Sequence, residues 1–255
     1  MATLLLHGLG ADRRQPLELF GPVLADSPEP VVALDVRAHG ASPLIGSAAD
    51  FTLPALAAEL AASARAALPP GEPVTLLGIS MGAALALRIA LDELLPVRRA
   101  VFVRPAFSSE ALPPNLHAFP VIAELLTRLG PAEGVESFRE SSLYQEVAAA
   151  SPAGGRGLLG QFTAPDAVAR AVRLTEIPRN RAYRDTAELA ALSARGVPAL
   201  VVAAPRDPVH PVEVAAEWAE GLGAELLTVP ARDDSQPAQT AALRAGLAEW
   251  LRTAG

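Results

Sequence analysis

Hydrophobic and polar positions along the chain form two alternating kinds of segment. Short, nearly continuous apolar runs, which are typical of strands buried on both faces, occupy residues 3–6, 31–34, 74–77, 100–103, 199–203 and 225–229. Between them Ala, Leu, Arg and Glu recur with helical spacing, near residues 54–68, 83–95, 212–221 and 240–251. This alternation predicts an α/β domain in which helices flank a mostly parallel sheet of about six strands.

The alternation breaks between the fourth and fifth predicted strands. Over roughly ninety residues this stretch contains proline pairs, a glycine-rich patch at 154–160 and several short helical runs, and it is too long for a simple connection. We therefore predict a helical cap insertion at residues 105–195, with residues 1–104 and 196–255 forming the core. Sites in parallel sheets form at the carboxyl ends of the strands, and such a cap would cover them.

The chemistry is indicated most clearly by a Gly-x-Ser-x-Gly sequence, Gly78 to Gly82, between an apolar strand and a helix of small residues. In a nucleophile elbow the two glycines allow a tight turn that lifts the central serine above the sheet. The adjacent helix N-terminus favours developing negative charge. A chance match is the alternative in a chain with 19 glycines, but the flanking strand and helix favour an elbow with Ser80 as nucleophile.

Two further motifs follow the first two predicted strands, and they read His7-Gly8-Leu9-Gly10 and Asp35-x-Arg37-x-His39-Gly40-x-Ser42. With the elbow and the insertion, they make the chain similar over nearly its whole length to the α/β-hydrolase superfamily of lipases, esterases, lactonases and related enzymes. The resemblance implies a capped α/β-hydrolase fold whose sheet is shortened at one edge. Because this fold hosts many reactions, the motifs do not specify the chemistry.

The resemblance also implies roles for individual residues. The backbone N–H groups of Leu9 and Met81 would form the oxyanion hole. Asp207, after the strand that follows the insertion, occupies the position of the triad acid, although an aspartate before Pro208 can also be a simple turn residue.

The sequence departs from the superfamily at the catalytic base, since no histidine follows His210. Asp234, Gln236 or Gln239 stands where the base is expected. Three explanations remain open. In the first, His210 is a relocated base. In the second, Asp234 or Asp233 acts as the base with a pKa raised by burial. In the third, the scaffold no longer performs serine hydrolysis.

These alternatives give two functional hypotheses. The first is hydrolysis of a small-molecule ester, lactone or thioester through Ser80 with an altered triad. The second is a non-hydrolytic lyase, cyclase, isomerase or ligand-binding protein with the same pocket. We predict that His7, Arg104 and His117 lie near the substrate. The alternative for Arg104 is an ion pair with an acidic residue of the cap. The alternative for His117 is a histidine that is exposed or already hydrogen-bonded within the protein.

Composition excludes several other classes of function. The chain of 255 residues has no cysteine and no lysine, which excludes thiolate nucleophiles, Schiff-base chemistry and Walker-type phosphate loops. A net charge of −7 disfavours nucleic-acid binding. Dispersed histidines predict no metal site, and we expect no cofactor.

The chain also offers no membrane segment, because its longest uncharged stretch, residues 73–87, is shorter than the roughly 20 residues of a bilayer span. Its N-terminus lacks the features of a signal peptide. We therefore expect a cytoplasmic protein that acts on a small-molecule substrate, and the sequence is compatible with a homodimer.

Overall fold

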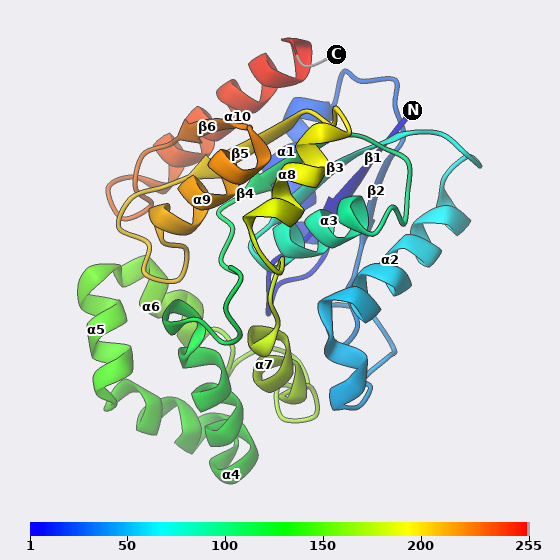
Figure 1. Cartoon of the computed structure of the whole chain (residues 1–255). Coiled ribbons are helices and arrows are strands. Elements are labelled where there is room, and N and C mark those ends of the chain that lie inside the picture. The colour runs from blue at the N-terminus through cyan, green and yellow to red at the C-terminus, as the bar shows by residue number, and fades with distance from the viewer. Residues whose placement is uncertain (254–255) are drawn as a thin grey trace.

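The computed structural model describes residues 1–253, and in them six strands form one sheet of order β2-β1-β3-β4-β5-β6 in which every neighbouring pair is parallel. The bounds are Ala2–Leu6 (β1), Val31–Leu34 (β2), Val74–Ile79 (β3), Val97–Val103 (β4), Ala199–Ala203 (β5) and Glu225–Thr228 (β6). This confirms the predicted α/β class and parallel sheet. Figure 1 shows the strands running through the centre of the molecule.

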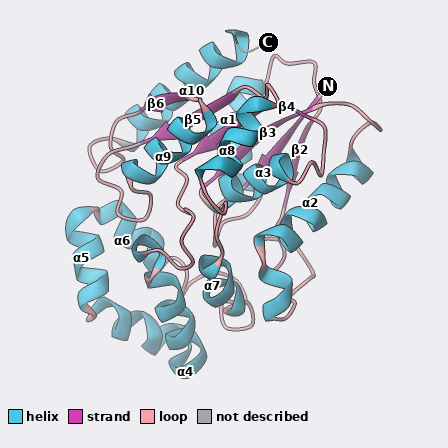
Figure 2. Cartoon of the chain, in the orientation of Figure 1, coloured by secondary structure: helices cyan, strands magenta, loops and turns pink. Residues whose placement is uncertain are grey.

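Helices cover both faces of the sheet (Figure 2). On one face α1 (Arg14–Leu24) packs against α10 (Gln236–Thr253), and on the other α2 (Leu53–Ala67), α3 (Met81–Leu91), α8 (Thr186–Ala194) and α9 (Val212–Leu222) lie side by side. Leu76 and Leu77 of β3 show why the apolar runs are continuous, because these adjacent residues belong to the cores on opposite faces.

Helix α1 was not predicted from the sequence. Its residues Pro16, Gly21 and Pro22 are unfavourable for helices in general, and they mask the helical spacing of the buried Phe20 and Leu24. Pro16 lies in the first turn, where a missing N–H is tolerated. Packing of Phe20 and Leu24 against the sheet therefore stabilises a helix that intrinsic propensity disfavours.

A helical segment, defined here as residues 104–198, connects β4 to β5. It contains α4 (Ala118–Arg139), α5 (Ser142–Ala150), α6 (Pro152–Leu159), α7 (Val172–Glu176) and α8, with short 3-10 turns at Pro114–Leu116 and Ile177–Arg179; another such turn, Ala48–Phe51, precedes α2. Helices α4–α7 gather below the carboxyl ends of the strands in Figure 1. Helix α8 instead packs against α3 and α9.

None of the helices among residues 1–253 combines the length and the apolar character that a membrane crossing requires. The same residues contain no group of three or more histidine, aspartate or glutamate side chains placed to hold a metal ion.

Candidate active site

Ser80 lies in a strained turn between β3 and α3, with a φ of 55° that few non-glycine residues adopt. Its N–H donates to Val103 O at 2.9 Å, which ties the turn to β4. A Cβ on Gly78 would overlap the backbone of Gly82, and one on Gly82 would overlap Leu6. The two glycines are therefore required by the close approach of backbone segments, as expected for an elbow.

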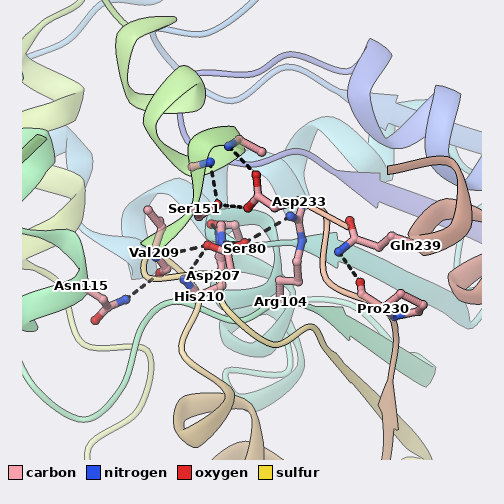
Figure 3. Close-up of polar contacts among 12 residues, drawn as sticks. Ser80, Arg104, Asn115, Ser151, Asp207, Val209, His210, Pro230, Asp233 and Gln239 are labelled. Atoms are coloured by element: carbon pink, nitrogen blue, oxygen red, sulfur yellow. Dashed lines mark hydrogen bonds and ion pairs between the residues drawn. The ribbon is translucent and has the colours of Figure 1, made fainter. Parts of the chain in front are cut away.

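The side chains of Ser80, His210 and Asp207 form a continuous hydrogen-bonded row (Figure 3). His210 Nε2 lies 2.9 Å from Ser80 Oγ, and His210 Nδ1 lies 2.9 Å from Asp207 Oδ2. Because a carboxylate can only accept, the proton belongs on Nδ1, which leaves Nε2 to accept the hydroxyl proton of Ser80. This is the arrangement that the relocated-base explanation requires.

The turn after β5 brings Asp207 and His210 together. Asp207 Oδ1 accepts the N–H groups of Val209 and His210, each at 3.2 Å, and the His210 N–H also lies 3.1 Å from Asp207 O. Pro208 has a fixed φ that favours such a turn. Hydrogen bonds within the turn thus hold side chains three positions apart in mutual contact.

Arg104 at the end of β4 is the second partner of Asp207, with Nη1 3.4 Å from Oδ2. Burial alone would raise the pKa of Asp207, but His210, Arg104 and Arg232 together hold that pKa well below its usual range. Burial lowers the pKa of Arg104, and Asp207 opposes that shift. The predicted alternative for Arg104, an ion pair with an acid of the helical segment, is not what forms, because its acidic partner comes from the β5–α9 turn.

Ser80, Asp207 and His210 line a pocket of about 200 Å³ between the sheet and the helical segment. Arg104 and the loop containing Leu9 also line it, and the helical segment contributes Phe119, Leu158 and Gln161. Leu9 and Ser80 therefore line the same pocket. Met81 is buried as the first residue of α3, where backbone N–H groups have no acceptor within the helix.

Three predicted site residues lie outside this pocket. His7 is buried in the core, where Nδ1 lies 2.8 Å from Gly8 O and Nε2 accepts the Val36 N–H, so both ring nitrogens are already used. His117 is exposed and bonded to Leu112 O at 3.1 Å. Asp234 forms an exposed ion pair with Arg206. His7, His117 and Asp234 therefore do not line the pocket that contains Ser80.

The other candidates for the base are also engaged elsewhere (Figure 3). Asp233 accepts hydrogen bonds from Ser151 Oγ and from the Ala153 N–H at the start of α6. Gln239 donates to Pro230 O at 2.9 Å. Asp233 therefore fastens the loop after β6 to the helical segment, whereas Arg232 of the same loop lines the pocket of Ser80.

Sequence reasoning missed three amides that organise the site. Gln15 Oε1 accepts the Gly8 N–H at 2.8 Å, which fixes the loop before Leu9. Asn115 donates to Val209 O at 2.8 Å and so ties the turn of His210 to the helical segment. Gln161, 8% exposed, lies over Gly10. No spacing rule singles out such residues, because their partners are backbone groups distant in sequence.

Comparison with known families decides the classification. The model of the alpha/beta hydrolase fold family matches residues 3–233. The chain belongs to the α/β hydrolase family. The sequence of this α/β hydrolase has no match among the curated proteins.

Several solved structures share the fold of this α/β hydrolase. MenH from S. aureus is 16% identical with a TM-score of 0.71, covering 100% of this chain and 94% of that one. A thermophilic esterase from Thermogutta terrifontis is 23% identical with a TM-score of 0.67 and coverages of 100% and 90%. The enol-lactonase from Burkholderia xenovorans is 20% identical with a TM-score of 0.68 and coverages of 98% and 90%. At these identities the similarity establishes the fold.

Proposed function

We propose that this α/β hydrolase cleaves a small-molecule ester, lactone or thioester with Ser80 as nucleophile, His210 as base and Asp207 as the acid that orients the base. The observation that carries the proposal is the 2.9 Å contact from His210 Nε2 to Ser80 Oγ, continued by the 2.9 Å contact from Nδ1 to Asp207. Such a row has the geometry that activates a serine hydroxyl. An esterase and an enol-lactonase among the structures of similar fold support this substrate range.

The reaction then runs in two stages. His210 accepts the proton of Ser80 while Oγ bonds to the carbonyl carbon, and the carbonyl oxygen becomes an oxyanion that the Leu9 and Met81 N–H groups stabilise. Collapse of this intermediate breaks the bond to the leaving alcohol or thiol, which takes the proton from His210. Water, deprotonated by His210, then releases the acid from Ser80.

Asp207 stabilises the imidazolium that forms in each stage. Its pKa is held well below the usual range, so the carboxylate is ionised and can stabilise that cation. Arg104 contacts the same carboxylate oxygen as His210 and, as a positioning residue, limits the rotation of the carboxylate. Helices α4–α7 serve as a cap, and the side chains of Phe119 and Leu158 give the pocket an apolar wall suited to a partly hydrophobic acyl group.

The test is intact-mass analysis after incubation with a fluorophosphonate, which modifies an activated serine. Wild type is expected to gain one adduct, Ser80→Ala to gain none, and His210→Ala to react at least about 10³-fold more slowly. His117→Ala removes an exposed histidine outside the pocket and is the matched control, expected to react at the wild-type rate.

Folded wild-type protein that forms no adduct would contradict the proposal and favour non-hydrolytic chemistry or ligand binding in the same pocket. Equal labelling of wild type and His210→Ala would refute the relocated base while keeping the serine nucleophile.

A further inference from the structure

A second pocket, of about 420 Å³, lies on the other side of the loop that follows β1. The loop contributes Gly10 to Arg14, the segment after β2 contributes Asp35, Gly40 and Ala41, and the helical segment contributes Ala164, Pro165, Arg170 and Arg173. Four arginines but only two aspartates therefore line this pocket. We call it the arginine pocket.

Both aspartates are already paired with the loop arginines. Asp35 accepts the N–H of Arg13 at 2.7 Å and lies 3.8 Å from its Nε, and Asp12 pairs with the Arg14 guanidinium. The positive charges contributed by the helical segment thus have no counter-ion among the acids that line the pocket. Among residues 1–253, the acidic partner of Arg170 is Asp166, an exposed residue 3.7 Å away.

Arg173 is the most unusual of these cations because it is only 3% exposed. Its guanidinium donates to Ala38 O, and it has no ion pair within residues 1–253. The Nε atoms of Arg170 and Arg173 are both buried and have no hydrogen-bond partner in the same part of the chain. Burial, followed by repulsion from Arg170, lowers the pKa of Arg173 to about 10. A dehydrated guanidinium without an acid is stabilised by a bound anion.

The arginine pocket is also adjacent to the candidate active site. Gly10 and Ala11 line both the arginine pocket and the pocket of Ser80. Gln161 lies over Gly10 at this junction, and its buried Oε1 has no hydrogen-bond partner among the described residues. A ligand that extends from Ser80 toward Arg173 would have to pass Gly10 and Gln161 at this junction.

We propose that the arginine pocket binds an oxyanionic group, a carboxylate or a phosphate, carried by the substrate whose carbonyl reacts at Ser80. The planar fork of arginine matches both groups. The inference rests on the proposed function and narrows it from esters in general to esters, lactones or thioesters with an acidic group at one end.

A purely structural role is the competing explanation. Arg173 and Arg170 donate to Ala38 O and Gly40 O, and these bonds fasten the helical segment to the loop after β2. Fastening predicts that substitution lowers stability equally with and without an anion. Anion binding predicts that an anion stabilises the folded protein and that the enzyme prefers negatively charged substrates. Both effects are expected to be lost when Arg173 is replaced.

The first measurement is thermal unfolding in phosphate against chloride of matched ionic strength, using wild type, Ser80→Ala, Arg173→Gln and Arg139→Gln. Phosphate at about 10 mM is expected to raise the midpoint of wild type and Ser80→Ala by about 2–4 °C, and that of Arg173→Gln by none. Arg139 is an exposed arginine of the same helical segment that pairs with Glu136, so Arg139→Gln is the matched control and keeps the shift. If Arg173→Gln does not fold, Arg173→Lys replaces it and is expected to show a smaller shift than wild type, because the fork is lost.

The second measurement compares 4-nitrophenyl monoesters of succinate to suberate with uncharged esters of equal carbon number. Wild type is expected to prefer the charged ester in kcat/KM at one or more lengths. Arg173→Gln is expected to lower that preference at least about tenfold, as for the loss of a charge-assisted hydrogen bond.

The outcomes distinguish a free anion from an anionic group on the substrate, and they distinguish failure of the arginine pocket from failure of the proposed hydrolysis. A phosphate shift that requires Arg173, without preference for charged esters, identifies a free anion as ligand and overturns a substrate-borne group. Absence of both effects overturns the arginine pocket as a binding site. A phosphate shift in a protein that hydrolyses none of the esters leaves anion binding intact and locates the failure in the proposed hydrolysis.

Discussion

His210 can contact Ser80 because its own backbone is held by the residue it pairs with. The Asp207 side chain bonds to the N–H of His210 and to its imidazole, so a single carboxylate sets both the turn and the ring orientation. From the sequence, Ser80 could be located by the strand, turn and helix patterns that surround it, and Asp207 by the resemblance to the superfamily. The role of His210 could not be decided, because spacing does not show on which side of a loop a ring lies.

Two other histidines limit stability toward acid. Burial lowers the pKa of His7 and lowers that of His39 well below its usual value, and nearby Arg173 adds to both shifts. The folded chain thus keeps both rings neutral, whereas the unfolded chain protonates them below about pH 6.5. Because the unfolded state binds more protons there, stability is complete above pH 6.5 and falls as the pH drops below it.

We predict that the free energy of unfolding falls between pH 7 and pH 5 with a slope of up to about 1.4 kcal/mol per pH unit for each of these histidines. Urea unfolding at closely spaced pH values measures it. The depressed pKa of Asp207 affects stability only below about pH 4, so the two windows are separate. An unchanged free energy from pH 7 to pH 5 would contradict neutral burial of His7 and His39.

At the scale of single elements, burial on two faces made β1, β3 and β5 predictable, but polar strand residues escaped detection. Strand β4 begins at Val97, three residues before its predicted start at Ala100, because Arg98 and Arg99 interrupt the apolar run. Arg99 nevertheless is 8% exposed and donates to Thr75 Oγ1 and to Leu251 O. Such tertiary partners cannot be inferred from the local pattern.

The connection between the β5–α9 turn and the helical segment gives a second prediction. Asn115 donates to Ala106 O at 2.9 Å and to Val209 O at 2.8 Å, next to His210. Replacing Asn115 by Ala is expected to lower kcat about tenfold or more with a smaller change in KM, because the proposed base, His210, loses its alignment. It should also lower the free energy of unfolding by about 1–3 kcal/mol.

Asn180→Ala is the matched control for this variant, since Asn180 also bonds to several backbone groups, including Phe51 O and Leu53 N–H, but away from His210. It is expected to lose stability and to retain kcat. Equal kcat in Asn115→Ala and wild type would show that Asn115 is only structural.

On the scale of the whole molecule, Asp233 connects the loop after β6 to the helical segment through Ser151 and Ala153. We predict that Asp233→Ala lowers the free energy of unfolding by about 0.5–2 kcal/mol, as for the loss of a helix cap, and speeds proteolysis within α5 and α6. Labelling of Ser80 should continue. Chemical denaturation, limited proteolysis and fluorophosphonate labelling measure the three effects.

Asp234→Ala serves as the comparison, because its ion pair with Arg206 is exposed and exposed pairs contribute about 0–1 kcal/mol. A folded Asp233→Ala protein that no longer forms the adduct would restore Asp233 as a candidate base and contradict the proposed role of His210.

The turn that contains both Asp207 and His210 has a consequence for the evolution of the sequence. When acid and base lie on separate loops, every substitution that shifts the last loop is exposed to selection on turnover. Here the proposed base does not come from that loop, so those of its residues that neither line the pocket nor hold the helical segment can vary while the reaction chemistry is preserved. A search that requires a histidine near the C-terminus would discard such descendants as inactive, although their proposed reacting groups lie within the first 210 residues.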